Sequence, residues 1–355
     1  MALLSRGDAG LVGVDISATS VKLVDLSKSG DKYRVEGYAI VPLPPNAIGD
    51  KNIADSGLVG EAIQQAVKIC KTKRKAACCA VPGSSAITKV ISMPEGLSDE
   101  DMEAQIKTEA DQYIPYPLDE ISLDFEVMRA EEADTTKVEV LLAATRSENV
   151  DVRVAALEAG GLTAKVVDIE PFAMEKAVSL MMSQGGEVGN AHILAIMDIG
   201  ASTSIFTVME DAHIIYTKEQ PFGGRALTED IQRRYGLSFE EATREKHNGG
   251  VMLPDNYEPE VLAPFKEQMA QEVNRALQFF YAGNQGGGVV DHILIAGGCA
   301  SLNGICELVQ AKTGTTVSVA NPFFKMGIPD NIRESLMNDA PALMIACGLA
   351  LRSFD

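Results

Sequence analysis

Basic residues, long apolar runs and a recognisable leader are scarce or missing in this sequence of 355 residues. Its 31 Lys and Arg face 50 Asp and Glu, which gives a formal net charge of -19. A nucleic-acid partner is disfavoured, because a phosphate backbone repels an acidic surface. The longest apolar stretches, such as PALMIACGLAL from Pro341, fall short of the roughly 20 residues that span a membrane. With no signal peptide recognisable, we expect a cytoplasmic protein.

Cysteine and histidine are few and lack the spacing of metal ligands. The six Cys include the neighbours Cys78 and Cys79 but no Cys-x-x-Cys pair, and the four His are scattered. This pattern argues against a disulfide framework and a zinc site, and it fits a reducing compartment. The chain is also too long for one ordinary core, so we expect two domains.

One pattern occurs twice, VGVDISATSVKLV at 12–24 and MDIGASTSIFTV at 197–208. Each is an apolar strand that ends in Asp, a turn of small polar residues and a second strand. Strands predicted at 12–16, 21–26 and 33–41 return in the same arrangement at 191–220. Such a duplication predicts an α/β protein of two similar lobes, with a ligand cleft at the strand ends.

A segment of different character separates the two copies and predicts an insertion. The expected boundaries are a first lobe of residues 1–81, 165–190 and 335–355, an inserted α+β subdomain of 82–164, a second lobe of 191–222 and 286–334, and a helical subdomain of 223–285.

The two turns suit a polyphosphate. Small residues let backbone amides approach an anion, and Ser and Thr add donors. Asp15 and Asp198 would repel phosphate directly, but they would suit Mg²⁺ held between them through waters. One such hairpin alone could be a plain β-turn closed by Asp, whereas the repetition favours a ligand site. A third stretch, LIAGGCASLNGI, places Gly297 and Gly298 before a helix that we expect Ser301 to cap.

These stretches resemble the nucleotide loops of the actin-like ATPase superfamily, which includes FtsA, sugar kinases and heat-shock chaperone ATPases. The resemblance implies duplicated actin-like (ribonuclease H-like) lobes flanking a nucleotide cleft, with an FtsA-like inserted α+β subdomain. It implies ATP and Mg²⁺ as ligands, with Asp15 and Asp198 on the metal through waters. The implied nucleotide-binding residues are Asp15, Ser17, Thr19, Ser20, Lys22, Asp198, Gly200, Ser202, Thr203, Gly223, Gly224, Lys246, Gly297, Gly298 and Gly304.

The resemblance also implies limited catalysis. Glu170, in DIEPFAMEKAV, matches a Glu that positions water in some relatives. Ser17, Ala201 and Ser202 stand where the superfamily usually has Gly, and Thr243 stands where it usually has Glu. We therefore expect nucleotide binding and, at most, a slow Mg²⁺-dependent ATPase.

The insertion carries a more specific resemblance. VISMPEGLSDEDMEAQIKTEADQYIPYPLDEISLDFEV, at 90–127, resembles the PilM family, cytoplasmic actin-like components of type IV pilus assembly. That resemblance implies a scaffold at the inner face of the inner membrane. It would recruit the N-terminal cytoplasmic peptide of the inner-membrane protein PilN in a groove between insertion and first lobe, and couple nucleotide state to partner binding. The candidates for lining the groove are Met93, Ile106, Tyr113, Ile114, Tyr116 and Phe125; the same side chains could instead form the core of the insertion.

Two alternative functions remain open from sequence. A small-molecule kinase of the same superfamily would need a general base near a substrate hydroxyl, and no Asp in the sequence suggests that role. A filament-forming ATPase is a second alternative and leaves self-association possible. Because LRSFD follows the last predicted helix directly, an FtsA-type membrane helix is not expected.

The basic run KTKRK at 71–75 suits a solvated helix end or, alternatively, anionic lipid.

Overall fold

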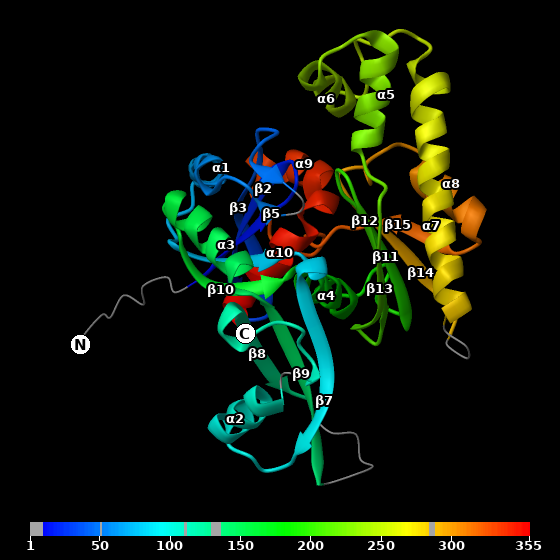
Figure 1. Ribbon diagram of the computed structural model, residues 1–355. Coiled ribbons are helices and arrows are strands. Elements are labelled where there is room, and N and C mark those ends of the chain that lie inside the picture. Colours follow the sequence, from blue (N-terminus) through cyan, green and yellow to red (C-terminus); the bar gives the residue numbers. More distant parts are fainter. Residues whose placement is uncertain (1–9, 50–51, 110–111, 129–135, 284–287) are drawn as a thin grey trace. The chain divides into compact units, whose positions relative to one another are not determined.

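The computed structural model describes residues 10–49, 52–109, 112–128, 136–283 and 288–355 (Figure 1). The chain divides into two compact units, Met1–Leu23 with Ala39–Phe172 and Val24–Tyr38 with Ala173–Asp355. This division cuts across the lobes expected from sequence, and the four-part domain scheme stays a prediction.

A five-stranded sheet in the order β10-β6-β1-β2-β3 contains the first hairpin. Strands β1 and β10 both run parallel to β6. The two long strands β2 and β3 contribute residues to both units. The bounds are β1 (Val12–Ile16), β2 (Ser20–Ser29), β3 (Lys32–Pro42), β6 (Ala76–Val81) and β10 (Thr163–Ile169), with the short pair β4 (Ile48–Gly49) and β5 (Asn52–Ile53) nearby in sequence.

Two helices, α1 (Ser56–Cys70) and α3 (Ser147–Ala159), pack closely against each other in the first unit. A Cβ on Gly60 would lie 2.5 Å from the Cβ of Ala159, so glycine permits the approach. Ala156 and Leu157 of α3 join Val12 and Val14 of β1 in one buried cluster. Helix α3, which the sequence analysis includes in the insertion, therefore belongs to the core of the five-stranded sheet.

The insertion forms a small α+β structure with its own core. Strands β7 (Ala86–Pro94), β9 (Lys137–Arg146) and β8 (Ile121–Val127) make an antiparallel three-stranded sheet in that order, and α2 (Asp99–Glu109) lies beside it in Figure 1. Strand β7 lies in a stretch for which the sequence predicts no strand. Short 3₁₀ turns at Gly83–Ser85 and Leu118–Glu120 precede β7 and β8.

The second unit repeats the strand order of the first sheet. Its five strands run β13-β12-β11-β14-β15, with an antiparallel meander followed by two parallel strands. In both sheets the three meander strands lie on one side, and the next strand of the same sheet pairs parallel to the first of them. The predicted duplication is confirmed. The bounds are β11 (Ile193–Ile199), β12 (Ser204–Glu210), β13 (His213–Gln220), β14 (His292–Gly297) and β15 (Thr316–Val319).

The helices of this unit begin and end at residues with clear local causes. Gly236, at φ 68°, ends α5 (Arg225–Tyr235), and Ser238 caps α6 (Phe239–His247) through a reciprocal bond with Glu241. The longest helix of this unit begins as a π turn, Glu258–Leu262, and continues as α7. The remaining bounds are α4 (Glu170–Ser183), α7 (Ala263–Gly283), α8 (Ile305–Thr313), α9 (Asp330–Asp339) and α10 (Met344–Leu351).

The predicted cap of α8 is wrong. Gly304, at φ 78°, precedes the helix without a side-chain cap, because the turn after β14 runs three residues beyond Ser301. The Ser301 hydroxyl donates instead to the carbonyl of Asn338 at 3.1 Å.

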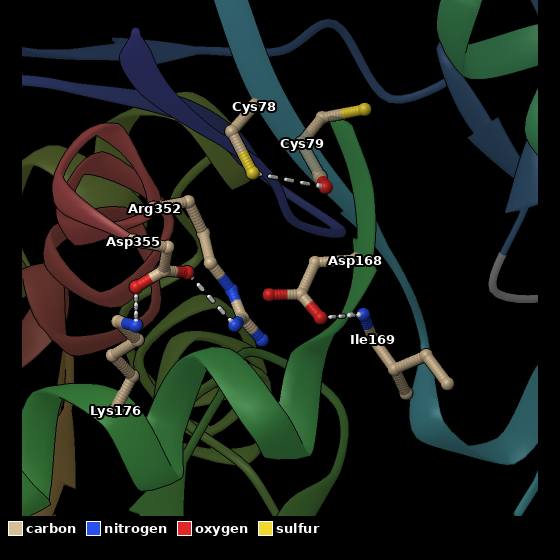
Figure 2. A network of polar contacts seen from close by, with 7 residues as sticks. All are labelled: Cys78, Cys79, Asp168, Ile169, Lys176, Arg352 and Asp355. Atoms are coloured by element: carbon tan, nitrogen blue, oxygen red, sulfur yellow. Dashed lines mark hydrogen bonds and ion pairs between the residues drawn. The ribbon is translucent and has the colours of Figure 1, made fainter. Parts of the chain in front are cut away.

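The chain end is held by charge pairs in the second unit. Lys176 of α4 and Arg352 both contact the Asp355 carboxylate (Figure 2). Over the described ranges, no helix combines the length and the apolar character needed to cross a membrane.

An exposed histidine gives the second unit a pH-dependent contribution to stability. The Nδ1 of His192 lies 2.6 Å from the Asp211 carboxylate and its Nε2 lies 3.4 Å from Glu210. The hydrogen bond with Asp211, and then the charges of Asp211, Glu210 and Asp291, raise the pKa of His192. Its stabilisation is therefore complete below the unfolded-state pKa and disappears as pH rises through the folded-state pKa. We expect His192→Asn to lower the melting temperature near pH 5.5 and to leave it unchanged near pH 8.5, whereas an equal loss at both pH values would contradict this assignment.

Candidate functional site

The first predicted phosphate turn joins β1 to β2 and is closed by hydrogen bonds of Ser17. Its backbone N–H donates to the carbonyl of Ser20 at 3.0 Å, and its hydroxyl donates to the same carbonyl at 2.9 Å. The Lys22 ammonium lies 2.8 Å from Asp15, whose side chain is 3% exposed. A buried ion pair thus joins the predicted metal-side carboxylate to the predicted phosphate contact. The carbonyl of Thr19 accepts a bond from the N–H of Leu43 at 2.9 Å.

The second predicted phosphate turn joins β11 to β12 and packs against the Gly223-Gly224 turn. The Gly200 N–H donates to the Thr203 carbonyl at 3.0 Å, and the Gly224 N–H donates to the Gly200 carbonyl at 2.9 Å. A Cβ on Gly223 would lie 2.5 Å from the carbonyl oxygen of Ala201. Only glycine allows this contact, so the pair Gly223-Gly224 builds one wall of the turn. Ser202 is exposed at its tip.

The glycine turn after β14 approaches the second phosphate turn from another strand. Gly297 has φ 86°, and a Cβ there would lie 2.3 Å from the Ile199 carbonyl oxygen and 2.7 Å from Asp198 Oδ1. Gly298 and Gly304 have no heavy atom within 4 Å of a built Cβ and face open space. Three predicted stretches thus meet around the carboxyl end of β11, which is where α/β sheets bind ligands.

One lysine reaches this turn from α6. The Lys246 ammonium donates to the Gly224 carbonyl at 3.0 Å. Burial lowers the pKa of Lys246, and the neighbouring Cys299 raises it slightly in return. Burial also raises the pKa of the Cys299 thiol. The Cys299 Sγ packs against Gly224, where an added Cβ would lie 2.7 Å from it. Cys299 is a wall residue for which the sequence offers no signal beyond its place after Gly298.

The second-unit residues fit an anionic ligand in two respects. Gly223, Gly224 and Gly297 let the three turns pack so closely that an added Cβ would lie within 2.7 Å of a neighbouring atom, while Gly298 and Gly304 leave open space beside them. On α6, three residues before Lys246, the Thr243 hydroxyl is buried without a hydrogen-bond partner among the described residues. Buried polar atoms are normally satisfied, so an unpaired hydroxyl on the helix that carries Lys246 is consistent with a polar ligand.

Glu170 begins α4, directly after β10. The preceding Asp168 is buried, and its carboxylate accepts the backbone N–H of Ile169 at 2.8 Å (Figure 2). Cys79 of the neighbouring strand β6 is also buried, and burial raises its pKa to about 12, so the thiol stays protonated. The role of Glu170 toward water stays a prediction.

The candidate peptide-lining residues all contribute to the core of the insertion. Met93, Ile106 and Ile114 are at most 3% exposed, while Tyr113, Tyr116 and Phe125 pack against that core with part of their surface free. Lys89 lies 4.7 Å from the ring of Tyr113, and Arg146 lies 4.6 Å from that of Tyr116. The first three side chains thus agree with the core alternative, and the second three keep surface that a partner could contact.

A sequence model of the family described as "Type IV pilus assembly protein PilM" matches residues 13–354. The chain belongs to the PilM family. Among curated proteins it is 26% identical over 189 residues to the cell division protein FtsA of Enterococcus hirae, which is 47% of this chain and 40% of that protein. It is 26% identical over 173 residues to FtsA of Bacillus subtilis (strain 168), covering 43% of this chain and 38% of that protein. The matches therefore span about two fifths of the length of FtsA.

Solved structures share the fold along nearly the whole chain. A PilM-PilN type IV pilus biogenesis complex superposes with a TM-score of 0.78 at 24% identity, covering 98% of this chain and 99% of that one. The ethanolamine utilization protein EutJ from Carboxydothermus hydrogenoformans gives 0.54 at 17% identity, covering 96% and 89%. Together with the repeated strand order, these similarities confirm the predicted duplicated actin-like fold for this PilM-family chain.

Proposed function

We propose that this chain is an ATP-binding scaffold of type IV pilus assembly, which holds the N-terminal peptide of an inner-membrane PilN protein and binds it with an affinity set by the nucleotide. The observation that carries the nucleotide claim is the close meeting of three glycine-containing turns, at Gly200, Gly223-Gly224 and Gly297-Gly298, with Lys246 bonded to one of them. Backbone amides and a poorly compensated ammonium suit phosphate oxygens. The PilN claim draws on family membership and on the PilM-PilN complex that shares this fold.

Magnesium would join through the phosphates. Across the described ranges, no group of three or more His, Cys, Asp and Glu side chains could hold a metal ion. Mg²⁺ typically keeps several waters and takes one or two carboxylates plus substrate phosphates. We therefore assign Asp15 and Asp198 to water-mediated contacts, with Mg²⁺ reducing the repulsion between these carboxylates and the phosphates.

The insertion would supply the peptide site. Tyr113, Tyr116 and Phe125 keep partly free apolar surface beside Lys89 and Arg146. Aromatic side chains next to cations suit an extended peptide that presents apolar side chains and carbonyl groups. Attachment of the chain to the inner face of the inner membrane would follow from this partner.

The test measures fluorescence anisotropy of a labelled PilN N-terminal peptide on the full chain without nucleotide, with ADP–Mg²⁺ and with ATP–Mg²⁺. We expect affinities that differ by about 5–150-fold between states, the usual range of such coupling. Equal affinities in all three states would remove the coupling, and the absence of peptide binding would remove the partner. Phosphorylation of a sugar in the presence of ATP would favour the kinase alternative.

The magnesium assignment has its own control. Asp198→Asn keeps the size of the side chain and removes its charge, so ATP binding should lose its dependence on Mg²⁺ while metal-free binding is kept. Titrating ATP by calorimetry with and without Mg²⁺ measures both quantities. An unchanged magnesium effect in the variant would show that Asp198 does not serve the metal.

A further inference from the structure

Arg153 of α3 is among the largest fully buried side chains of the protein, at 2% exposure. Its Nε donates to the Ala80 carbonyl at 2.7 Å, and its Nη1 donates to Asn52 Oδ1 at 3.0 Å and to the Asn149 carbonyl at 2.8 Å. All three acceptors are uncharged. A buried guanidinium is costly unless its surroundings compensate it, so a position that keeps one calls for an explanation.

The acceptors of Arg153 lie where the chain crosses between the first sheet and the insertion. Ala80 is the last but one residue of β6, just before the 3₁₀ turn that leads into β7. Asn149 lies in the first turn of α3, just after β9 returns from the insertion. One side chain therefore binds the backbone of both crossings.

Further hydrogen bonds join the two crossings to each other. Asn52 Nδ2 donates to Asn149 Oδ1 at 3.0 Å, and Asn149 Nδ2 donates to Thr145 Oγ1 at 3.1 Å. The Thr145 hydroxyl donates to the Ser85 carbonyl at 2.7 Å. We call this set the crossing network; its members are Ala80, Ser85, Thr145, Asn149, Asn52 and Arg153.

The crossing network reaches the start of α4 in two ways. A Cβ on Gly83 would lie 2.8 Å from Cγ of Pro171, so the turn that leads into β7 packs against the residue after Glu170. The charge of Glu170 also acts on Arg153: burial lowers the pKa of Arg153, and the Glu170 carboxylate raises it in return. Glu170 is thus a carboxylate whose charge stabilises the buried guanidinium.

We propose that Arg153 is a positioning residue which fixes the insertion relative to Glu170, so that a change of charge around Glu170 reaches the peptide-binding subdomain through the crossing network. This inference rests on the proposed function, because it names the route by which nucleotide would alter peptide affinity. A cation or phosphate arriving near Glu170 changes how well its carboxylate compensates Arg153, and the geometry of both crossings depends on Arg153.

The test compares Arg153→Met and Thr145→Val with wild type on the full chain. Methionine keeps the length of the side chain without the charge, and an apolar replacement of a buried ion is often tolerated. Thr145→Val removes both hydrogen bonds of the Thr145 hydroxyl, to Ser85 and from Asn149, and leaves Arg153 in place. Arg233→Met, on the exposed surface of α5, is the matched control. Each variant is measured for ATP affinity, for the ratio of peptide affinities with and without ATP–Mg²⁺, and for hydrogen exchange of the Ser85 and Ile53 amides.

We expect Arg153→Met to bind ATP within about twofold of wild type and to bind the peptide equally well with and without ATP–Mg²⁺. Its Ser85 and Ile53 amides should exchange hydrogen at least about tenfold faster, because the crossings open locally while the rest of the protein stays folded. Thr145→Val should reduce the ratio of peptide affinities at least about threefold, because it removes part of the network that carries the coupling. If Arg153→Met does not fold, the result for Thr145→Val tests the inference by itself. Arg233→Met should match wild type throughout. A folded Arg153→Met or Thr145→Val variant that keeps the wild-type ratio overturns the inference alone, whereas a wild-type protein without any ratio overturns the proposed coupling itself.

Discussion

Gly297→Ala is expected to abolish ATP binding and to lower the melting temperature of the ligand-free protein, whereas Gly298→Ala should leave that temperature unchanged. Gly297 has φ 86°, and its added Cβ would lie 2.3 Å from the Ile199 carbonyl oxygen. A non-glycine residue in such a conformation costs about 1–3 kcal/mol before any clash is counted. The carbonyl in its way belongs to β11, so relief of the clash displaces the strand end that carries Asp198.

The size of the effect can be measured by calorimetry. For a unit of this length, each kcal/mol lowers the melting temperature by about 2–4 °C, so a loss of about 2–12 °C is expected for Gly297→Ala. Gly298 is the matched control, because a Cβ at the next residue of the same turn meets no heavy atom within 4 Å. Wild-type melting and ATP binding by Gly297→Ala would refute both the tight turn and its place in the nucleotide site.

Lys246→Met is expected to weaken ATP binding by about 10–100-fold, as the loss of a charged hydrogen bond of about 1.5–3 kcal/mol predicts, without destabilising the ligand-free protein. The ammonium donates to the Gly224 carbonyl, and burial lowers the pKa of Lys246. The folded state thus disfavours the charged form, and this destabilisation is relieved as pH rises from the folded-state pKa toward the ordinary lysine value. Methionine removes the buried charge, so the stability of Lys246→Met should not rise at alkaline pH as that of the wild type does.

Two measurements separate binding from stability for Lys246. ATP titration gives the affinity, and thermal unfolding between pH 7 and pH 10 gives the ligand-free stability. Lys312→Met is the control, because Lys312 lies on α8 in an ion pair with Glu267 and outside the candidate site. A strongly destabilised Lys246→Met that still binds ATP as wild type does would make Lys246 a structural residue.

The repeated part of the fold could be predicted from sequence, because short apolar strands joined by small polar turns are local patterns. The assignment of α3 could not be predicted in the same way. Its apolar residues Ala156 and Leu157 would suit either neighbouring core, and helical periodicity does not say which sheet a helix covers. The cap of α8 was mispredicted for a similar reason, because the preference of Ser301 for capping is local while the length of the turn is fixed by the positive φ of Gly304.

The candidate site also contains residues that the sequence identifies and residues that only the folded chain reveals. Its glycines and Lys246 could be identified from the resemblance, since each stands in a recognisable stretch. Cys299 and the orphaned Thr243 hydroxyl depend on distances between strands and helices that are remote in sequence. Arg153 stood out least, because an arginine on a helix is usually solvated and only the folded chain shows it buried.

The matching strand orders of the two sheets bear on how the insertion could have arisen. In the second sheet the chain passes from β14 to its parallel neighbour β15 through α8 alone; in the first it passes from β6 to β10 through the three-stranded subdomain and then α3. Parallel neighbours require such a crossover, usually a helix, so α3 is the counterpart of α8 and the subdomain is an enlargement of the loop before it. A whole subdomain can therefore be gained or exchanged at that loop in one copy of a duplicated fold while every strand pairing of both copies is preserved.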